Sequence, residues 1–374
     1  MVKSIGLYLH IPFCRGKCPY CDFYSMRADT ACMDTYTQAL QKSMAQWAER
    51  VGRAADTLYL GGGTPSLLGG ARIEALVQTA RDCYGLRGAE VTVECNPSDA
   101  DGRLFEMLAQ AGVNRISLGL QSAVDEERKA LGRRAGVKEA AESIRLARAV
   151  GIPNLSLDLM LGIPGQTAES LRRSIDFCVQ AGVRHISAYL LKIEEGTLFA
   201  RRRASLALPE EDAVCDLYEQ ACESLEAAGF RQYEISNFAR PGFESRHNLK
   251  YWNAEEYLGL GASAHSFLEG KRFFYLRDLP AFLRGEEPIQ DGEGGSFEEY
   301  AMLRMRLAGG LQEGAVRQRY GCGIPPKMRE SARRMEQYGL VSQDGDGIRL
   351  TRKGFLLSNT VIAELLYPAS GTAG

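Results

Sequence analysis

The feature that most constrains this chain is a regular alternation of short β-rich runs with longer helical patterns, from residue 5 to about residue 229. Runs rich in Val, Ile, Leu or Tyr predict six strands, at Ile5–His10, Thr57–Gly61, Glu90–Asn96, Arg115–Gln121, Leu155–Leu161 and His185–Leu191. Helical patterns follow them at Asp34–Val51, Ala71–Tyr84, Asp101–Ala111, Lys138–Ala149, Ala168–Ala181 and Glu210–Ala228. Successive βα units indicate a parallel sheet that right-handed crossovers cover with helices.

An incomplete (βα)6 barrel and a doubly wound sheet both fit this pattern, and in either one functional side chains gather at the carboxyl ends of the strands. The alternation stops after residue 229, which divides the chain into three parts. We expect a core at 1–229, an aromatic-rich connecting segment at 230–295, and a smaller, mainly helical, winged-helix-like lobe at 296–374. In that lobe we expect a β-hairpin that turns on Asp-Gly, a helix at Lys353–Leu366 and a disordered tail at Ser370–Gly374.

Composition narrows the class of protein. The formal net charge is −2, so no basic field indicates a nucleic-acid partner. No run approaches the ~18 apolar residues of a transmembrane helix, and Met1–His10 lacks the cleavage site of a signal peptide, so we expect a cytoplasmic protein. In a reducing compartment ten cysteines do not predict a disulfide framework. Seven of them are expected to fill the core: Cys32, Cys83, Cys95, Cys178, Cys215, Cys222 and Cys322.

The other three cysteines lie in the loop after the first predicted strand. Cys14, Cys18 and Cys21 are separated by three and then two residues, and the Gly and Pro between them favour a curled loop. Thiolates are suitable ligands for iron–sulfur clusters and for zinc. A structural zinc site needs four ligands, and His10 has the wrong spacing to be the fourth. Three thiolates therefore favour a [4Fe-4S] cluster with one iron open to a small-molecule ligand.

This cysteine spacing resembles the signature of the radical S-adenosylmethionine (radical SAM) superfamily. The resemblance implies an incomplete barrel in which the open iron chelates the amino and carboxylate groups of S-adenosylmethionine. It also implies that an electron from the cluster can cleave the C–S bond to give a deoxyadenosyl radical, while the protein positions the reactants. A cluster that serves only structure or electron sensing is the alternative.

Glycines and polar residues follow or interrupt the other predicted strands. The run Gly61–Pro65 forms either a tight turn or a loop whose backbone approaches a ligand closely. Glu94 and Asp158 interrupt apolar runs, where a carboxylate is costly unless it is paired or binds a ligand. With Gln121 and Arg133 they form either an internal polar network or a binding site. The chain resembles the coproporphyrinogen-oxidase-like branch of the superfamily, and this implies S-adenosylmethionine contacts for Tyr8, Gly62, Gly63, Thr64, Glu94, Gln121, Arg133 and Asp158.

Two features separate the chain from the oxygen-independent coproporphyrinogen III oxidase of this branch. That enzyme has a further cysteine where this chain has Phe23, and a longer segment before its cluster loop. The run from His247 to Trp252 resembles the His-Asn-x-x-Tyr-Trp motif of the haem chaperones of the branch, the HemW proteins, and implies haem contacts for His247, Asn248, Tyr251 and Trp252. Imidazole is a good axial ligand for haem iron, and aromatic rings can pack on a porphyrin. The alternative is that His247 caps a loop while Tyr251 and Trp252 fill the core.

The resemblance favours a haem carrier that binds haem and transfers it to apo-haemoproteins. These targets include membrane respiratory enzymes, which it would reach through transient complexes. The expected cofactors are a [4Fe-4S] cluster, S-adenosylmethionine and haem, and no catalytic residue is assigned. The alternative is the oxidase itself, acting by radical decarboxylation of propionate side chains. We expect a cytoplasmic protein that associates with membranes through its partners, and a homodimer is compatible with the sequence.

Overall fold

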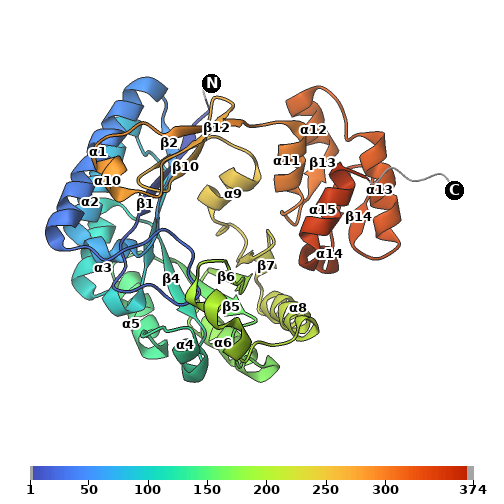
Figure 1. The fold of residues 1–374 in the computed structure, drawn as a ribbon, viewed down its shortest axis with the longest axis horizontal. Helices are drawn as coiled ribbons and strands as arrows, with labels where there is room; N and C mark the ends of the chain where they lie inside the picture. The colour runs from blue at the N-terminus through green and yellow to red at the C-terminus, as the bar shows by residue number, and fades with distance from the viewer. Residues whose placement is uncertain (1–2, 369–374) are drawn as a thin grey trace.

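Six parallel strands lie side by side in chain order and form the centre of a curved sheet (Figure 1). The structure, a computed structural model, describes residues 3–368, so the expectation for the tail Ser370–Gly374 falls outside the described residues. The strands are β1 (Ile5–Ile11), β2 (Ala55–Gly62), β3 (Glu90–Cys95), β4 (Arg115–Gln121), β5 (Asn154–Leu161) and β6 (His185–Leu190). Within residues 3–368 the two outer strands of the sheet do not pair with each other. Sequential order in an open sheet is the winding of an incomplete (βα)6 barrel, which confirms the predicted fold class.

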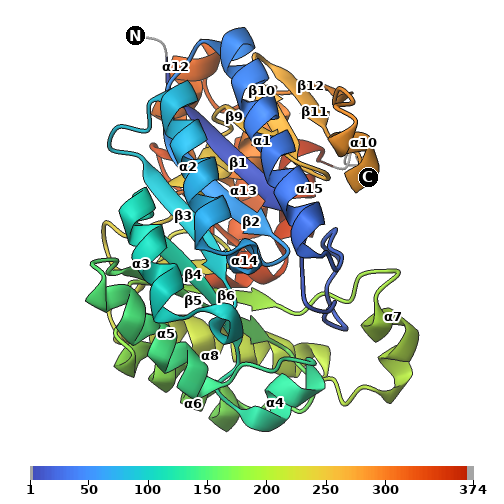
Figure 2. The same cartoon turned by 90° about the vertical axis from the view of Figure 1, so that its left-hand side faces the viewer.

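Helices cover the convex face of this sheet (Figures 1 and 2). The long ones are α1 (Thr30–Val51), α2 (Gly70–Tyr84), α3 (Gly102–Ala111), α5 (Val137–Ala149), α6 (Ala168–Gln180) and α8 (Glu211–Ala227). Each predicted helix and strand of the βα part is present, with ends that differ by a few residues. The short helices α4 (Asp125–Ala130) and α7 (Leu198–Arg202) belong to the connections after β4 and β6.

Side chains alternate between the two faces along each of the six strands. In β4, Ile116 and Leu118 belong to the hydrophobic core, whereas Arg115, Ser117 and Gln121 face the concave side. A strand has a side-chain period of two, and parallel strands that are covered by helices on both faces are usually apolar throughout. The alternation therefore shows that the helices of the βα units pack against the convex face alone. The concave face is left for polar groups.

The sheet continues beyond both edges of the six strands. At one edge β9 (Tyr257–Leu260) pairs in parallel with β1, and antiparallel pairing then adds β10 (His265–Leu268), β11 (Lys271–Phe274) and β12 (Ile289–Glu293). At the other edge β8 (Asn237–Ala239) and β7 (Arg231–Gln232) follow β6. The helix α9 (Arg246–Trp252) lies in the hollow of the curve, and α10 (Leu279–Leu283) lies against α1 (Figure 1). The sequence did not predict these short strands, and the division at residues 230 and 295 stays a prediction.

The C-terminal part is a separate lobe of helices around a small sheet (Figure 1). It contains α11 (Phe297–Arg304), α12 (Glu313–Tyr320), α13 (Pro326–Glu336), α14 (Arg352–Leu356) and α15 (Ser358–Leu366). Its three strands are β13 (Leu311–Gln312), β14 (Val341–Gln343) and β15 (Gly347–Leu350). Pairing of β14 with β15 confirms the predicted hairpin. The predicted helix Lys353–Leu366 is interrupted at Leu357, whose φ of −105° and ψ of 20° leave the helical region.

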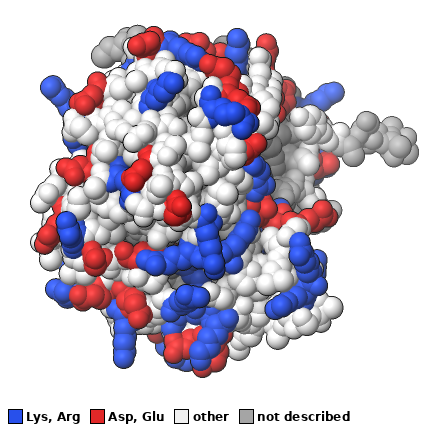
Figure 3. Space-filling view, turned by 60° about the vertical axis from the view of Figure 1, so that its left-hand side comes forward, with Lys and Arg blue, Asp and Glu red and all other residues white. Residues whose placement is uncertain are grey.

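Acidic and basic side chains are interspersed on the surface. On the face seen in Figure 3, Lys and Arg form a short band near the middle, with Asp and Glu around it. Residues 3–368 include no helix that is both long and apolar enough to cross a membrane.

A buried tyrosine joins α1 to the segment that adds strands at the β1 edge. The Tyr36 hydroxyl donates a hydrogen bond to the His10 carbonyl at 2.7 Å and accepts one from the Ala262 N–H at 3.2 Å. Tyr36 is fully buried. Both backbone groups would lack a partner without the hydroxyl, because no water can reach them there.

We expect Tyr36→Phe to lower the free energy of unfolding by about 1–3 kcal/mol, since it leaves a buried N–H and a buried C=O unsatisfied. Urea denaturation of the two proteins measures the difference. Tyr338→Phe is the matched control, because Tyr338 is 69% exposed and should change stability little. Equal effects of the two substitutions would contradict the role given to Tyr36.

Candidate functional site

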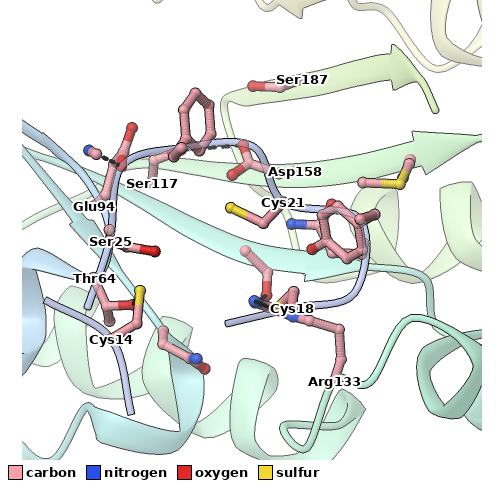
Figure 4. A pocket seen from close by; sticks show the side chains of 18 of the residues that line it. Cys14, Cys18, Cys21, Ser25, Thr64, Glu94, Ser117, Arg133, Asp158 and Ser187 are labelled. Atoms are coloured by element: carbon pink, nitrogen blue, oxygen red, sulfur yellow. Dashed lines mark hydrogen bonds between the residues drawn. The ribbon is translucent and has the colours of Figure 1, made fainter. Parts of the chain in front are cut away.

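A cavity of about 880 Å³ lies on the concave face, between the ends of the strands and the loop that follows β1 (Figure 4). Most of the site residues expected from the sequence line it: Cys14, Cys18, Cys21, Gly62, Gly63, Thr64, Glu94, Gln121, Arg133, Asp158 and Asn248. They come from the cysteine loop, from the strands β2 to β5 and the segments that follow β2 and α4, and, for Asn248, from α9. Tyr8, His247, Tyr251 and Trp252 do not line the cavity.

The cysteine loop borders the cavity with three free, partly buried thiols. Its backbone curls through hydrogen bonds from the Cys14 N–H to the Met26 carbonyl, at 2.9 Å, and from the Cys21 N–H to the Cys18 carbonyl, at 3.1 Å. No three Cys, His, Asp or Glu side chains within residues 3–368 are placed to hold one metal ion. In a [4Fe-4S] cluster each thiolate binds a different iron, so the sulfurs surround the cluster and need not converge on one ion.

Cations lie beside these thiols. Arg133 Nη1 is 3.8 Å from Cys18 Sγ. Burial raises the pKa of the Cys21 thiol, and a hydrogen bond from the Phe23 backbone and the charge of Lys17 oppose this rise. Metal ligation requires thiolates, and neighbouring cations favour them. The free thiols and nearby cations therefore fit an anionic iron–sulfur cluster.

The glycine run after β2 packs directly on the cysteine loop. The Gly63 N–H donates to the Ile11 carbonyl and the Thr64 N–H to the Phe13 carbonyl, each at 2.8 Å. A Cβ at Gly63 would lie 2.8 Å from both of these carbonyl oxygens, so the contact requires glycine. Thr64 Oγ1 in turn lies 3.4 Å from Cys14 Sγ. The run is therefore more than a tight turn, because it supports the first cysteine.

Two carboxylates of the strands face the cavity with their own donors. Tyr59 donates to Glu94 Oε1 at 2.7 Å, and the Gly62 N–H donates to Glu94 Oε2 at 3.1 Å. Ser117 donates to Asp158 Oδ1 at 3.2 Å. Burial raises the pKa of Glu94 to about 7, although the hydrogen bond from Tyr59 opposes the shift. Burial also raises the pKa of Asp158. Both groups can thus hold a proton more readily than an exposed carboxyl.

Gln121 turns into the cavity at an irregular point of β4. Its φ of 70° is unusual for a residue other than glycine, and the pairing of β4 with β5 shifts register between Gly119 and Gln121. Such bulges re-aim side chains, often beside functional sites. Tyr189 donates to Gln121 Oε1 at 2.7 Å, and Arg133 donates to the Gly119 carbonyl at 2.5 Å. These bonds fix both side chains at the cavity wall.

His247 is buried behind the cavity, with 1% of its surface exposed. Its Nδ1 is 2.7 Å from Thr57 Oγ1, and its Nε2 is 2.7 Å from the Tyr251 hydroxyl. The His247 N–H also donates to Glu90 Oε1 at 3.1 Å. Burial lowers the pKa of His247 to about 3, so the imidazole is neutral here. Both ring nitrogens are engaged within the protein in this conformation.

Tyr8, which was expected to contact S-adenosylmethionine, packs beside this histidine, and the other residues of the expected haem motif lie on α9. Tyr8 stacks on His247 with ring centroids 6.3 Å apart, and its hydroxyl is 3.0 Å from His10 Nδ1. Asn248 reaches the cavity wall, whereas Trp252 is partly buried at the end of α9. In this conformation the motif packs the interior of the half-barrel, and its role in haem binding stays a prediction.

Sequence reasoning missed several polar side chains of the cavity wall. Their signal was present in the period-two alternation of the strands, which places polar residues on one face of each strand. The missed residues are Tyr59, Arg115, Ser117, Ser187 and Tyr189.

The raised pKa of Glu94 predicts a pH-dependent stability. Because the folded state binds this proton more tightly than the unfolded chain, whose ordinary value is near 4.5, stability should fall as pH rises from about 4.5 to about 7. The loss from this one group is at most about 3 kcal/mol. Glu94→Gln should flatten the pH dependence in urea denaturation between pH 5 and pH 7.5. The same slope in both proteins would contradict the assignment.

Comparisons with known proteins agree with this architecture. The family described as Radical SAM superfamily matches residues 8–178, and the HemN C-terminal domain matches residues 297–357. A protein of Mycobacterium tuberculosis named "Heme chaperone HemW" is 37% identical over 97% of this chain and 95% of its own length. The protein of the same name from Escherichia coli is 39% identical over 82% of this chain and 84% of its own length.

A solved structure has the same fold. Coproporphyrinogen III oxidase (HemN) of Escherichia coli superposes with a TM-score of 0.84 at 22% identity, over 97% of this chain and 90% of that one. At that sequence identity the structural match establishes the fold alone. The near-full-length sequence matches identify the family. This chain therefore belongs to the radical SAM superfamily and, within it, to the HemW family.

Proposed function

We propose that this protein is a haem chaperone, which binds haem and passes it to apo-haemoproteins. The observation that carries the proposal is the match, over nearly the whole chain, to relatives named as haem chaperones, among them a Bacillus subtilis protein at 32% identity. The proposal extends to acceptors that include membrane respiratory enzymes, reached through transient complexes from the cytoplasm. A homodimer is compatible with this proposal.

The proposed metal centre is a [4Fe-4S] cluster held by Cys14, Cys18 and Cys21. Three free thiols on one cavity wall, with the cations of Lys17 and Arg133 beside them, support this proposal. When bound, such a cluster supplies an open iron and a transferable electron. The chain keeps Cys14 in position through the bonds between the glycine run and the cysteine loop.

The proposed S-adenosylmethionine site is the rest of this cavity. The N–H groups of Gly62, Gly63 and Thr64 already donate within the protein, so their loop would meet an ammonium group with carbonyl oxygens. Glu94 and Asp158 supply carboxylates that can accept hydrogen bonds from a ligand. The complete proposed set is Tyr8, Gly62, Gly63, Thr64, Glu94, Gln121, Arg133 and Asp158. Tyr8 belongs to it only through contact with Tyr59, which lines the cavity.

The proposed haem site includes His247, Asn248, Tyr251 and Trp252. Its support is the position of α9 inside the curve of the sheet, with Asn248 at the cavity wall (Figure 1). Axial ligation by His247 would require its bond to Thr57 or to Tyr251 to break. Haem binding through this histidine, which is 1% exposed, therefore requires the side chains around it to rearrange.

We do not propose the activity of a coproporphyrinogen oxidase. Phe23 occupies the position at which the enzyme of this branch has a further cysteine, and its side chain is 66% exposed beside the loop. Anaerobic conversion of coproporphyrinogen III to protoporphyrinogen would be the observation that restores this alternative.

Substitution of the loop cysteines should abolish the cluster. After anaerobic reconstitution we expect about four irons per chain in the wild type and a large loss in Cys14→Ser, Cys18→Ser and Cys21→Ser, because each thiolate binds one iron. Cys32→Ser is the control, since Cys32 is a free thiol outside the cavity. Iron and sulfide counts that are the same in all five proteins would refute the cluster assignment.

Haem titration tests the histidine. If His247 is an axial ligand, His247→Ala should shift the Soret band and weaken haem binding, whereas His265→Ala should leave both unchanged, because His265 is exposed on β10. Circular dichroism of each variant reports whether the fold is kept. Identical Soret spectra and stoichiometry in folded His247→Ala and wild type would remove His247 from the haem site.

A further inference from the structure

Arg115 is a buried cation without a bonded partner. It is the first residue of β4, lines the cavity, and has 2% of its surface exposed. Its Nε lacks any hydrogen-bond partner, and within residues 3–368 no hydrogen bond or ion pair reaches its guanidinium. A guanidinium carries five donors and keeps its charge, so burying it unpaired is strongly unfavourable.

Two neighbours of Arg115 are unpartnered as well. Thr92 of β3 and Asn154 of β5 lie in register with Arg115, so the three side chains leave the same face of the sheet. Thr92 Oγ1 and Asn154 Oδ1 are buried and have no hydrogen-bond partner. Asn237 Oδ1, from β8, is also unpartnered and lines the same cavity. Thr92 and Asn154 flank Arg115 in the sheet without lining the cavity. Arg115 itself lines the cavity at the amino-terminal end of β4, and we call this end of the cavity the floor.

The buried carboxylates around the floor are already engaged. Glu90 accepts the N–H groups that open α9, and Glu234 accepts the N–H of Ser236. Glu94 accepts bonds from β2, and Asp158 accepts one from Ser117. Glu94 and Asp158 also belong to the proposed S-adenosylmethionine site. Burial raises the pKa of Glu94 and of Asp158 and the charge of Arg115 lowers it, but neither carboxylate accepts a hydrogen bond from the Arg115 guanidinium.

We infer that the floor of the cavity is a carboxylate-binding subsite, in which Arg115 pairs with a carboxylate of a small molecule that lies beyond the proposed S-adenosylmethionine position. The planar guanidinium can bind both oxygens of a carboxylate, and this pairing is among the strongest that a buried arginine makes. The unpartnered Oδ1 of Asn237 in the cavity wall accepts hydrogen bonds, so it would take a donor group of the ligand and not the carboxylate itself.

The carboxylate has two possible carriers, a haem propionate and a small free carboxylic acid. The assignment of a haem propionate rests on the proposed function, whereas the inference of a carboxylate subsite does not. Haem, haem dimethyl ester and succinate are therefore the probes. The ester keeps the porphyrin and removes the charge, and succinate keeps the charge without the porphyrin.

Binding of the three probes is measured by titration with the full-length, cluster-reconstituted protein. We expect Arg115→Gln to weaken the binding of haem or of succinate at least tenfold, and to leave the binding of the dimethyl ester unchanged. Which of the two acids loses affinity identifies the carrier. Arg115→Lys should keep part of the affinity, because it retains the charge but loses the two-point contact. Arg134→Gln, an exposed arginine at the cavity mouth, should behave as the wild type.

Unchanged affinity of Arg115→Gln for haem and succinate would overturn the inference, and so would an equal loss for haem and its ester. The Tm of the ligand-free protein gives a second readout. Arg115→Gln should maintain or raise this Tm, because it removes an unpaired buried charge. A lower Tm with unchanged binding would show that Arg115 is purely structural. If Arg115→Gln does not fold, full affinity in Arg115→Lys refutes the subsite. Failure of wild-type protein to bind haem would count against the proposed function, while the succinate measurement would still test Arg115.

Discussion

The fold depends on one constraint, which is that the helices of the βα units cover only one face of the curved sheet. Apolar side chains must then leave every strand on the convex side, as Leu118 and Leu157 do. The residues between them can be polar, because they face a cavity instead of a packed layer. Six adjacent strands repeat this arrangement, so the concave face collects serines, tyrosines, carboxylates and arginines within one volume (Figure 4). The site is therefore a direct consequence of how the sheet is covered.

Polar groups on the concave face fall into two sets, those that have hydrogen-bond partners within the protein and those that have none. Glu94, Gln121 and His247 each have partners within the protein, which offset the cost of burial and fix their orientation. Arg115 and Thr92 do not. Satisfied groups build a rigid wall, whereas unsatisfied ones lower the stability of the protein when no ligand is bound. The cavity thus combines both kinds of wall.

Local patterns predicted the six strands, their helices and the cysteine loop, because hydrophobic period and ligand spacing are local properties of the sequence. The strands β7 to β12 were missed, since they have only two to five residues and β9 pairs with β1 across some 250 residues. The burial of His247 could not be predicted either, because it depends on α9 packing into the concave face. Arg115 was predictable in principle: it is the first polar residue of an alternating strand, and that alternation was visible in the sequence.

The central claim is that this cavity unites an iron–sulfur cluster with S-adenosylmethionine on its open iron. The most direct measurement is the electron paramagnetic resonance spectrum of the reconstituted, dithionite-reduced protein with and without S-adenosylmethionine. We predict the signal of a reduced four-iron cluster whose g-values shift when S-adenosylmethionine is added, because the ligand binds the iron itself. A signal that S-adenosylmethionine leaves unchanged, or no cluster signal at all, would contradict the account.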